Sequence, residues 1–316
     1  MSIEQLENLR DLTTSLLGTR KAAILVGDAL SLLKSVPAGT FRCCVTSPPY
    51  WGLRDYGIPN QIGAEPDLSD YVKHLVKVFR EVRRTLTDDG TLWLNLGDSY
   101  TSGNRKWRDA DDKNPARAMS YRPPTPKGLK PKDLIGVPWR VAFALQEDGW
   151  FLRSDIIWHK PNCQPESVQD RPTRCHEYVF MFSKSKDYYY DRDAVMEPTC
   201  SNGGRRNLRT VWSINTEPFP EAHFATFPCA LVEPCVRAGS GRGDVILDPF
   251  LGSGTVGVVC LKLNRRVIGL ELNDDYAKIA RRRIGEDLPL WHMGVCPSCS
   301  YPDGHFPESV ARREGL

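Results

Sequence analysis

The sequence predicts a doubly wound α/β fold with a mostly parallel sheet, and two stretches carry that prediction. Residues 244–269 contain a buried-strand pattern, a glycine turn, an apolar helix and a second strand, which together make a βαβ unit. Residues 41–45 predict another buried strand, and Pro48 and Pro49 stop it because proline has no N–H for a strand ladder. With 316 residues and 41% hydrophobic content, the chain can bury a large core without disulfides.

Hydrophobic spacing predicts the remaining elements. Apolar residues recur at helical spacing over residues 69–86, and this helix is expected to end before Asp88-Asp89-Gly90. The other expected elements are strands over 92–96, 152–158 and 178–183 and helices over 134–146 and 275–284. No apolar run approaches the ~18 residues that span a membrane, so no membrane partner is expected.

Residues 46–52, TSPPYWG, predict a site for a flat polar ligand at the end of the strand over 41–45. The Ser47 hydroxyl and the Pro48 carbonyl are acceptors, and Tyr50 and Trp51 add flat aromatic faces. Acceptors beside a stacking face suit the amino group of a nucleobase. The alternative is a proline turn that closes a strand, with the aromatic rings packed for stability.

A second motif follows the strand over 245–247. Gly252, Gly254 and Gly257 satisfy the pattern G-x-G-x-x-G, and Glu271 follows at the distance expected for a ribose-binding acid. Asp248 stands where the pyrophosphate of a dinucleotide would pass, and a like-charge contact at ~4 Å would cost about 4 kcal/mol at an effective dielectric constant of about 20. S-adenosylmethionine, which carries an ammonium group and no phosphate, therefore fits better than NAD, which remains the alternative.

With both motifs in this order, the chain resembles the beta class of DNA amino-methyltransferases, which methylate the exocyclic nitrogen of cytosine or adenine. The resemblance covers most of residues 22–284 and includes residues 25–28, 92–98, 156–161 and 176–178. It implies S-adenosyl-L-methionine as cofactor and a small DNA-recognition region. Because the base motif precedes the cofactor motif, the expected seven-stranded sheet is a circularly permuted, Rossmann-like methyltransferase sheet.

Roles for individual residues follow from this resemblance. Those that would hold the target base, and so act as catalytic residues, are Ser47, Pro48, Pro49 and Tyr50. Asp28 would approach the adenine of the cofactor, Glu271 would bind its ribose, and residues 223–231 would close over its methionine part. The full set of implied cofactor residues is Asp28, His223, Phe227, Pro228, Asp248, Pro249, Phe250, Gly252, Ser253, Gly254, Thr255, Glu271, Leu272 and Asn273.

Two basic stretches are expected to bind double-stranded DNA, although the net charge of +3 alone does not indicate a nucleic acid. Residues 99–132 hold nine Lys or Arg against three Asp, interspersed with prolines, and a long basic loop can contact phosphates. The alternative is a solvated insert. Residues 202–209 lie where the beta class places its target-recognition segment. The expected DNA contacts are Trp51, Arg105, Lys106, Arg108, Arg205, Arg206 and Arg209.

The chemistry expected from these residues is direct methyl transfer to a flipped-out base. Cys43 and Cys44 lie within a predicted strand, so they are expected to be core residues and not the nucleophile that carbon methylation would need. No metal is required for the step. Because serine before the two prolines accompanies cytosine more often than adenine in this family, Ser47 favours the N4 of cytosine over the N6 of adenine. A DNA-binding protein that has lost catalysis and a dehydrogenase remain as alternatives from other classes.

Residues 1–290 are expected to form the catalytic domain, with the basic loop at 99–132 and the target-recognition segment at 186–222. Residues 291–316 form a tail in which His292, Cys296, Cys299 and His305 have a spacing that a structural zinc site could use, against a loose tail with reduced thiols. The ten cysteines follow no secretory signal, so we expect a cytoplasmic protein with mostly reduced thiols. A homodimer and a companion restriction endonuclease are compatible with the resemblance, and the sequence decides neither.

Overall fold

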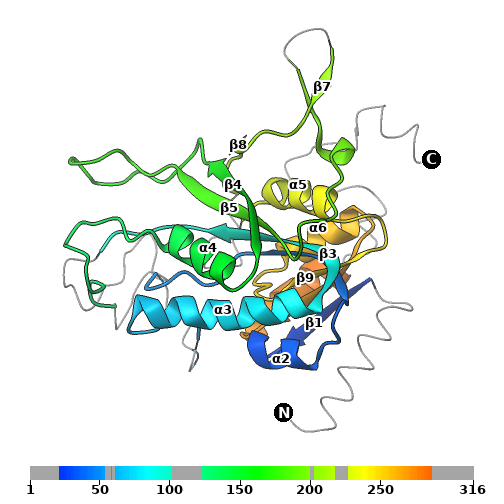
Figure 1. Cartoon of the computed structure of the whole chain (residues 1–316), viewed down its shortest axis with the longest axis horizontal. Coiled ribbons are helices and arrows are strands. Elements are labelled where there is room, and N and C mark those ends of the chain that lie inside the picture. Colours follow the sequence, from blue (N-terminus) through cyan, green and yellow to red (C-terminus); the bar gives the residue numbers. More distant parts are fainter. Residues whose placement is uncertain are drawn as a thin grey trace.

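The computed structural model describes residues 21–53, 58, 61–101, 123–199, 203–217 and 227–286. Within these residues an eight-stranded sheet has the order β1-β10-β9-β2-β3-β5-β4-β8, with helices on both of its faces (Figure 1). Its strands are β1 (Ala22–Val26), β2 (Phe41–Thr46), β3 (Leu86–Leu96), β4 (Phe151–His159), β5 (His176–Ser183), β8 (Val211–Ser213), β9 (Val245–Asp248) and β10 (Arg266–Glu271).

The strand order reverses between β9 and β2, and this switch point positions the site. From β2 the chain passes through helix α3 (Leu68–Thr85) to β3 on one side, whereas from β9 it passes through helix α6 (Thr255–Lys262) to β10 on the other. All pairings from β1 to β3 are parallel. The carboxyl ends of these strands therefore meet at one edge of the sheet, where doubly wound folds bind their ligands.

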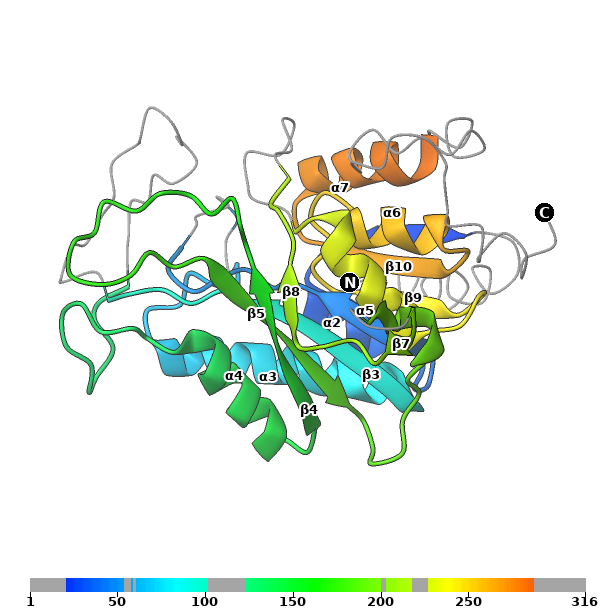
Figure 2. The same ribbon diagram turned by 90° about the horizontal axis from the view of Figure 1, so that it is seen from above.

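Two helical layers cover the sheet (Figure 2). One face carries α2 (Ala29–Ser35), α3 and α4 (Val137–Glu147), and the other carries α5 (Cys229–Gly239), α6 and α7 (Asp274–Arg281). Each layer has its own buried cluster of apolar side chains. In α3 the residues facing the sheet recur at helical spacing and are almost fully buried, namely Tyr71, Leu75, Val78, Phe79 and Val82.

The predicted fold class is confirmed, with three departures in detail. The sheet has eight strands and not seven, because the short β8 pairs with β4 in parallel at its edge. Strand β3 begins at Leu86, so Asp88-Asp89-Gly90 lies within the strand and not beyond a helix end. Helix α5 and the two-stranded ladder of β6 (Glu197–Pro198) and β7 (Arg205–Arg206) were not expected.

Five of the ten cysteines are buried thiols in the sheet or its covering helices, namely Cys43, Cys44, Cys229, Cys235 and Cys260. Cys43 and Cys44 are fully buried in β2, where burial raises the pKa of Cys43 to about 12, so they are core residues. Cys163 and Cys175 form a disulfide, a pair that the expectation of mostly reduced thiols did not identify. The remaining three, Cys200, Cys296 and Cys299, lie outside the described residues, as do His292 and His305 of the tail.

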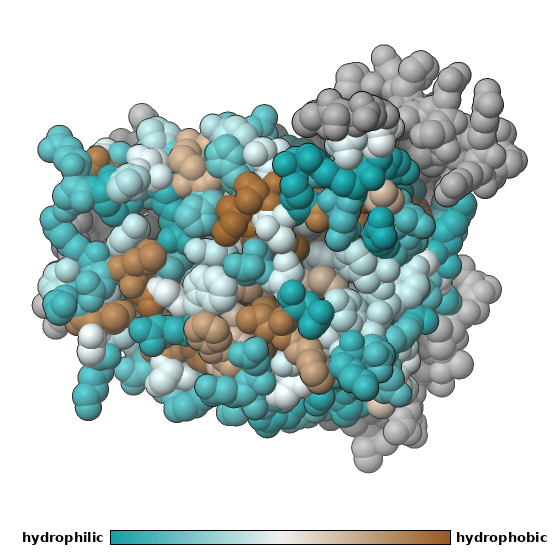
Figure 3. Space-filling model, turned by 45° about the horizontal axis from the view of Figure 1, so that its top comes forward, coloured by the Kyte–Doolittle hydropathy of each residue, from teal (hydrophilic) through white to brown (hydrophobic). Residues whose placement is uncertain are grey.

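The surface mixes apolar and polar groups. The large exposed hydrophobic side chains are scattered over several elements and include Val26, Phe143, Phe151 and Val211. On the face drawn in Figure 3 the hydrophobic residues form separate patches among hydrophilic ones. Within the described ranges, no helix is both long and apolar enough to cross a membrane.

Candidate active site

The end of β2 delivers the Ser-Pro-Pro-Tyr segment to the switch point. Thr46, the last residue of β2, is buried, and Ser47 is the first residue beyond the strand. The Pro49 carbonyl accepts a 2.9 Å hydrogen bond from the Tyr71 hydroxyl of α3, which fixes the turn against the helix layer. The segment is therefore held on the α3 side, and the Ser47 and Tyr50 side chains contribute to the candidate site.

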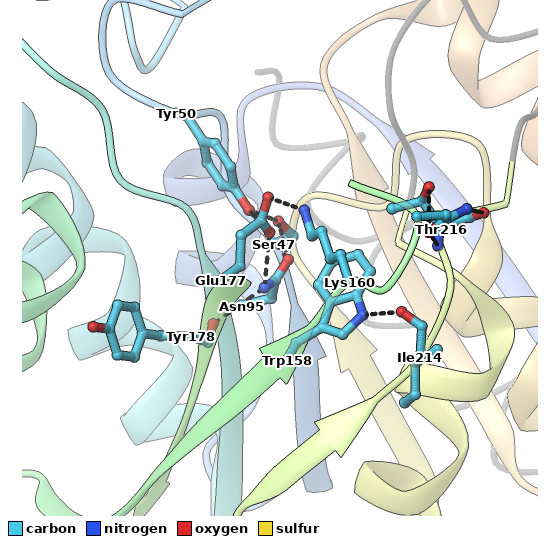
Figure 4. Close-up of polar contacts among 10 residues, drawn as sticks. Ser47, Tyr50, Asn95, Trp158, Lys160, Glu177, Tyr178, Ile214 and Thr216 are labelled. Atoms are coloured by element: carbon cyan, nitrogen blue, oxygen red, sulfur yellow. Dashed lines mark hydrogen bonds and ion pairs between the residues drawn. The ribbon is translucent and has the colours of Figure 1, made fainter. Parts of the chain in front are cut away.

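Ser47 and Tyr50 belong to a polar cluster that also contains Asn95 and Glu177 (Figure 4). The Asn95 Oδ1 lies 3.2 Å from Ser47 Oγ and 3.1 Å from the Tyr50 hydroxyl. The Tyr50 hydroxyl lies 2.9 Å from Glu177 Oε2 and 3.4 Å from Ser47 Oγ. Burial, followed by the charge of Glu177, raises the pKa of Tyr50 well above its usual range, so the phenol stays protonated.

Gly97 makes room for this cluster beside Tyr50. A Cβ at position 97 would lie 2.6 Å from Tyr50 Cε2 and 3.2 Å from the carboxyl carbon of Glu177. Such a distance is too short for a real contact, so a side chain here would displace the ring or the carboxylate. Glycine at this position is thus part of what lets the tyrosine approach β5.

Lys160 completes the cluster from β4. Its ammonium pairs with Glu177 Oε1 and lies 4.1 Å from the centre of the Trp158 ring. The Trp158 Nε1 donates a 2.8 Å hydrogen bond to the Ile214 carbonyl, which holds the ring in place. Lys160 and Glu177 are 17% and 18% exposed, so the pair is largely removed from solvent.

Sequence reasoning missed Asn95, Lys160 and Glu177 as site residues, although it singled out the stretches that contain them. The reason is topological, because β5 pairs with β3 and β4 in antiparallel fashion. Its amino end, at Glu177, therefore lies at the edge where β3 and β4 have their carboxyl ends. A polar residue at the start of a strand cannot be assigned to the site until the direction of that strand is known.

Asp248, at the end of β9, is buried with only one of its two oxygens satisfied. Its Oδ1 accepts hydrogen bonds from Thr46 Oγ1 at 2.6 Å and from the Phe250 N–H at 3.1 Å. Its Oδ2 is buried and has no hydrogen-bond partner in the part of the chain that is described. Burial raises the pKa of Asp248 to about 7, with Thr46 and Phe250 acting in the opposite direction. A buried, unsatisfied carboxylate oxygen suits a cationic ligand group.

The glycine loop after Asp248 turns tightly into α6. Gly252 and Gly254 have φ values of +55° and +89°, in the left-handed region that favours glycine. A Cβ at Gly254 would lie 3.0 Å from Ala280 Cβ and from Ile284 Cδ1. Arg283 donates from Nη1 to the carbonyl and the hydroxyl of Ser253, both at 2.8 Å, so the loop is held by the segment that follows α7.

Glu271 and Asp28 lie at the ends of the next two strands, β10 and β1. The Glu271 carboxylate accepts hydrogen bonds from the Gly252 N–H at 2.7 Å and from the Asn273 N–H at 2.8 Å, and burial raises its pKa. Asp28 is exposed and caps α2 through Ser31. The Gly27 N–H donates to the Glu271 carbonyl at 2.8 Å, so the two acids stand on neighbouring turns.

The other expected cofactor residues divide into three groups. Pro249, Phe250 and Thr255 belong to the same loop and helix start as Asp248. Leu272 is 37% exposed beside Glu271, whereas the Asn273 side chain caps α7 through the N–H of Asp275 at 2.9 Å. Phe227 and Pro228 directly precede α5, with Phe227 packed on the second core cluster, and His223 lies outside the described residues.

The expected DNA contacts receive one correction. Trp51 is only 5% exposed, and its Nε1 donates a 2.9 Å hydrogen bond to the Glu65 carbonyl. It is a core residue in this structure, so its ring is not available to DNA. The three basic residues of the loop, Arg105, Lys106 and Arg108, lie outside the described residues.

The second basic stretch is present on the surface but partly neutralised. Arg206 and Arg209 both pair with Glu197 Oε1, across and beside the β6–β7 ladder. Arg205 donates to the Met196 carbonyl at 3.0 Å. The ladder projects from the body of the molecule on the side of α5 (Figure 1).

Comparison with known proteins agrees with this geometry. The family model described as DNA methylase, N6_N4_Mtase, matches residues 41–282. The type II methyltransferase M.SmaI of Serratia marcescens is 64% identical over 266 residues, which are 84% of this chain and 91% of that protein. M.Cfr9I of Citrobacter freundii, also a type II methyltransferase, is 62% identical over 84% of this chain and 89% of its own length.

Two solved structures share the fold. The cytosine-N4-specific PvuII DNA methyltransferase has a TM-score of 0.62 and 20% identity, covering 93% of this chain and 91% of its own. A proposed DNA modification methylase from Thermus thermophilus, solved in complex with S-adenosyl-L-methionine, has a TM-score of 0.59 and 27% identity. That match covers 85% of this chain and 95% of the other.

Proposed function

The chain belongs to the N6/N4 DNA methylase family, and from that premise we propose that it methylates the N4 amine of cytosine in double-stranded DNA. The observation that supports the proposal is the contact between Thr46, directly before Ser47, and Asp248 across the switch point. The carboxyl ends of β2, β9 and β10 bring the segment proposed to hold the base and the carboxylates Asp248 and Glu271 to one edge of the sheet.

S-adenosyl-L-methionine supplies an electrophilic methyl group on a sulfonium when it is bound. The unsatisfied Oδ2 of Asp248 suits its ammonium group, and the remaining lone pairs of the Glu271 carboxylate suit a ribose diol. The backbone of residues 252–254, whose conformation requires glycine at two positions, leaves the turn open for close approach. Asp28 stands at the end of β1, where it can reach the adenine.

The base-holding residues act on the amine itself. Its lone pair is delocalised into the ring, and hydrogen bonds from its N–H groups to Ser47 Oγ and the Pro48 carbonyl favour a tetrahedral nitrogen with a free lone pair. Tyr50 offers a face on which a flipped-out base stacks, offsetting part of the few kcal/mol that unstacking costs. With the amine held in line, positioning supplies much of the rate.

The choice of cytosine rests on Ser47, which stands before the two prolines where adenine-specific relatives more often carry an acid or its amide. The likeness to the cytosine-N4-specific PvuII enzyme concerns the fold and does not choose the base. The relatives at 64% and 62% identity are named type II methyltransferases, which supports a role in restriction-modification, and a companion endonuclease is part of this proposal.

Nucleoside analysis tests this function. Purified protein is incubated with S-adenosylmethionine and unmethylated plasmid DNA, and the digested nucleosides are weighed by mass spectrometry. N4-methylcytosine is expected, its amount falling strongly for Ser47→Ala but not for Ser185→Ala, a serine beyond the opposite end of β5. Only N6-methyladenine would overturn the base assignment. Cofactor and DNA binding without any methylated base would favour a DNA-binding protein that has lost catalysis.

A further inference from the structure

Asn95 is buried between Ser47 and strand β5, at 6% exposure, and its amide has partners on both sides. Its Nδ2 lies 3.1 Å from the Tyr178 carbonyl and 3.2 Å from Glu177 Oε2. Its Oδ1 lies 3.2 Å from Ser47 Oγ. We infer that Asn95 is a positioning residue whose Oδ1 accepts a hydrogen bond from the Ser47 hydroxyl and so turns the serine lone pairs toward the base amine.

The orientation of the Asn95 amide follows from its neighbours. A carbonyl and a carboxylate can only accept hydrogen bonds, so the NH2 group must face Tyr178 and Glu177. The amide oxygen must then face Ser47 and Tyr50. Reversing the amide would place two acceptors against each other on the β5 side, which a buried site does not tolerate.

The proton count around Ser47 fixes its role. Tyr50 has one proton, and the Glu177 carboxyl group, with Oε2 2.9 Å away, is its nearest acceptor. The Ser47 hydroxyl then donates its hydrogen bond to Asn95 Oδ1. If Tyr50 instead donated to Asn95, the Ser47 hydroxyl would donate to the Tyr50 oxygen at 3.4 Å, and Asn95 would orient Ser47 through Tyr50. In both arrangements the Ser47 proton points into the cluster and away from the base.

This direction matters because an exocyclic amine offers only N–H donors to Ser47. A serine free to rotate would spend part of its time with its own proton facing the amine, which repels it. The inference rests on the proposed function, in which Ser47 accepts from the amine. Lys160 pairs with Glu177 Oε1, which leaves Oε2 to accept from the Asn95 NH2 group and so keeps the amide in one orientation.

A double-mutant cycle tests the inference, with Ser47→Ala, Asn95→Leu and the double variant assayed for methyl transfer at saturating cofactor and DNA. We expect Asn95→Leu to lower kcat about ten- to a hundredfold, with cofactor affinity close to wild type. The melting temperature should fall modestly, because the Tyr178 carbonyl and Glu177 Oε2 lose their donor. In the Ser47→Ala background, Asn95→Leu should cause no further loss. Losses that multiply would overturn the inference. A wild-type chain that produces no methylated base would instead contradict the proposed function.

Asn95→Asp provides a second test that also serves if the leucine variant does not fold. A protonated aspartic acid can donate to Glu177 and accept from Ser47, as the amide does, whereas its carboxylate repels Glu177. The titratable groups facing position 95 are Tyr50 and Glu177, with Lys160 behind the latter. We expect kcat of Asn95→Asp to rise relative to wild type as the pH falls. A folded variant with a ratio that does not change with pH would overturn the inference.

Discussion

Thr46 Oγ1 donates a 2.6 Å hydrogen bond to Asp248 Oδ1 across the switch point of the sheet. Both side chains are 1% exposed, and they stand 202 residues apart in the chain. Ser47 follows Thr46 and the glycine loop follows Asp248, so this single bond joins the segment proposed to hold the base to the turn proposed to bind the cofactor. A substitution at Thr46 or Asp248 should therefore affect both cofactor binding and the position of Ser47.

The first prediction concerns proton release when the cofactor binds. Since the pKa of Asp248 is about 7, a large part of the apoprotein carries this proton near neutral pH. A ligand ammonium beside Oδ2 favours the carboxylate, so S-adenosylmethionine binding at about pH 7 should release a proton. Calorimetry in buffers of different ionisation enthalpy should give different apparent binding enthalpies. Asp248→Asn should remove the difference between buffers. A wild-type binding enthalpy that is the same in all buffers would mean that the cofactor ammonium does not bind beside Asp248.

The second prediction is the pH dependence of stability. The pKa of Asp248 is about 7 in the folded protein against 3.8 for the ordinary group, so the folded state binds the proton more tightly. Its contribution to the free energy of unfolding is fully present below about pH 4 and is lost as the pH rises through 7. At about 1.4 kcal/mol for each pH unit it amounts to at most about 4 kcal/mol.

Denaturant unfolding of the apoprotein at several pH values checks this sign. Between pH ~5 and pH ~8 the wild type should lose stability relative to Asp248→Asn, which cannot ionise. A Thr46→Val variant, which keeps the side-chain shape and removes the donor, should raise the pKa of Asp248 further and move the loss to higher pH. A wild-type curve parallel to that of Asp248→Asn would contradict the prediction.

The third prediction separates packing from DNA contact at Trp51. Trp51→Ala should lower the free energy of unfolding by about 3–5 kcal/mol because it opens a cavity in the core. Trp51→Phe keeps most of the packing and loses the bond to the Glu65 carbonyl, a cost of about 1–2 kcal/mol. DNA affinity of Trp51→Phe should stay within about twofold of wild type. Phe143→Ala, at a half-exposed position, is the control. A Trp51→Phe variant that is stable but binds DNA poorly would mean that Trp51 does contact DNA.

The elements that the sequence predicts well are those with a strong period and clear ends. The βαβ unit around Gly252 and the amphipathic helix α3 lie where their patterns place them, to within one or two residues. Helix α5 carries Pro234 in its interior, which hides it from the same reasoning. The acidic Asp88-Asp89-Gly90 predicts a turn, yet it lies in β3, where β2 and β3 shift register between Phe41 and Cys43.

The residues of the candidate site also divide into those that strand patterns locate and those that they do not. Ser47 and Asp248 lie at the carboxyl ends of parallel strands, a position that strand patterns locate. Asn95 lies near the carboxyl end of β3, but its role depends on its contacts with β5. Glu177 depends on β5 being antiparallel and on its register, neither of which can be obtained from periodicity. Trp51 lies in a turn without any period, so nothing in the sequence distinguishes a buried ring from an exposed one.

The last prediction concerns the arginines of the segment expected to recognise the target sequence. Glu197 holds Arg206 and Arg209, and hydrogen bonds from both keep the pKa of Glu197 below its usual range despite the opposing effect of burial. A phosphate must compete with this carboxylate for either guanidinium. Glu197→Gln should therefore strengthen non-specific DNA binding and steepen its salt dependence.

Arg209→Ala should do the reverse, reducing the slope of log affinity against log salt by about one if this side chain neutralises one phosphate. Glu233→Gln is the matched control, because it removes the same charge from an Arg237 pair on α5. Titrations of a DNA duplex at several salt concentrations measure all three variants. Weaker binding by Glu197→Gln, with a slope equal to that of wild type, would mean that Glu197 serves to hold the β6–β7 ladder in shape and that the arginines meet no phosphate.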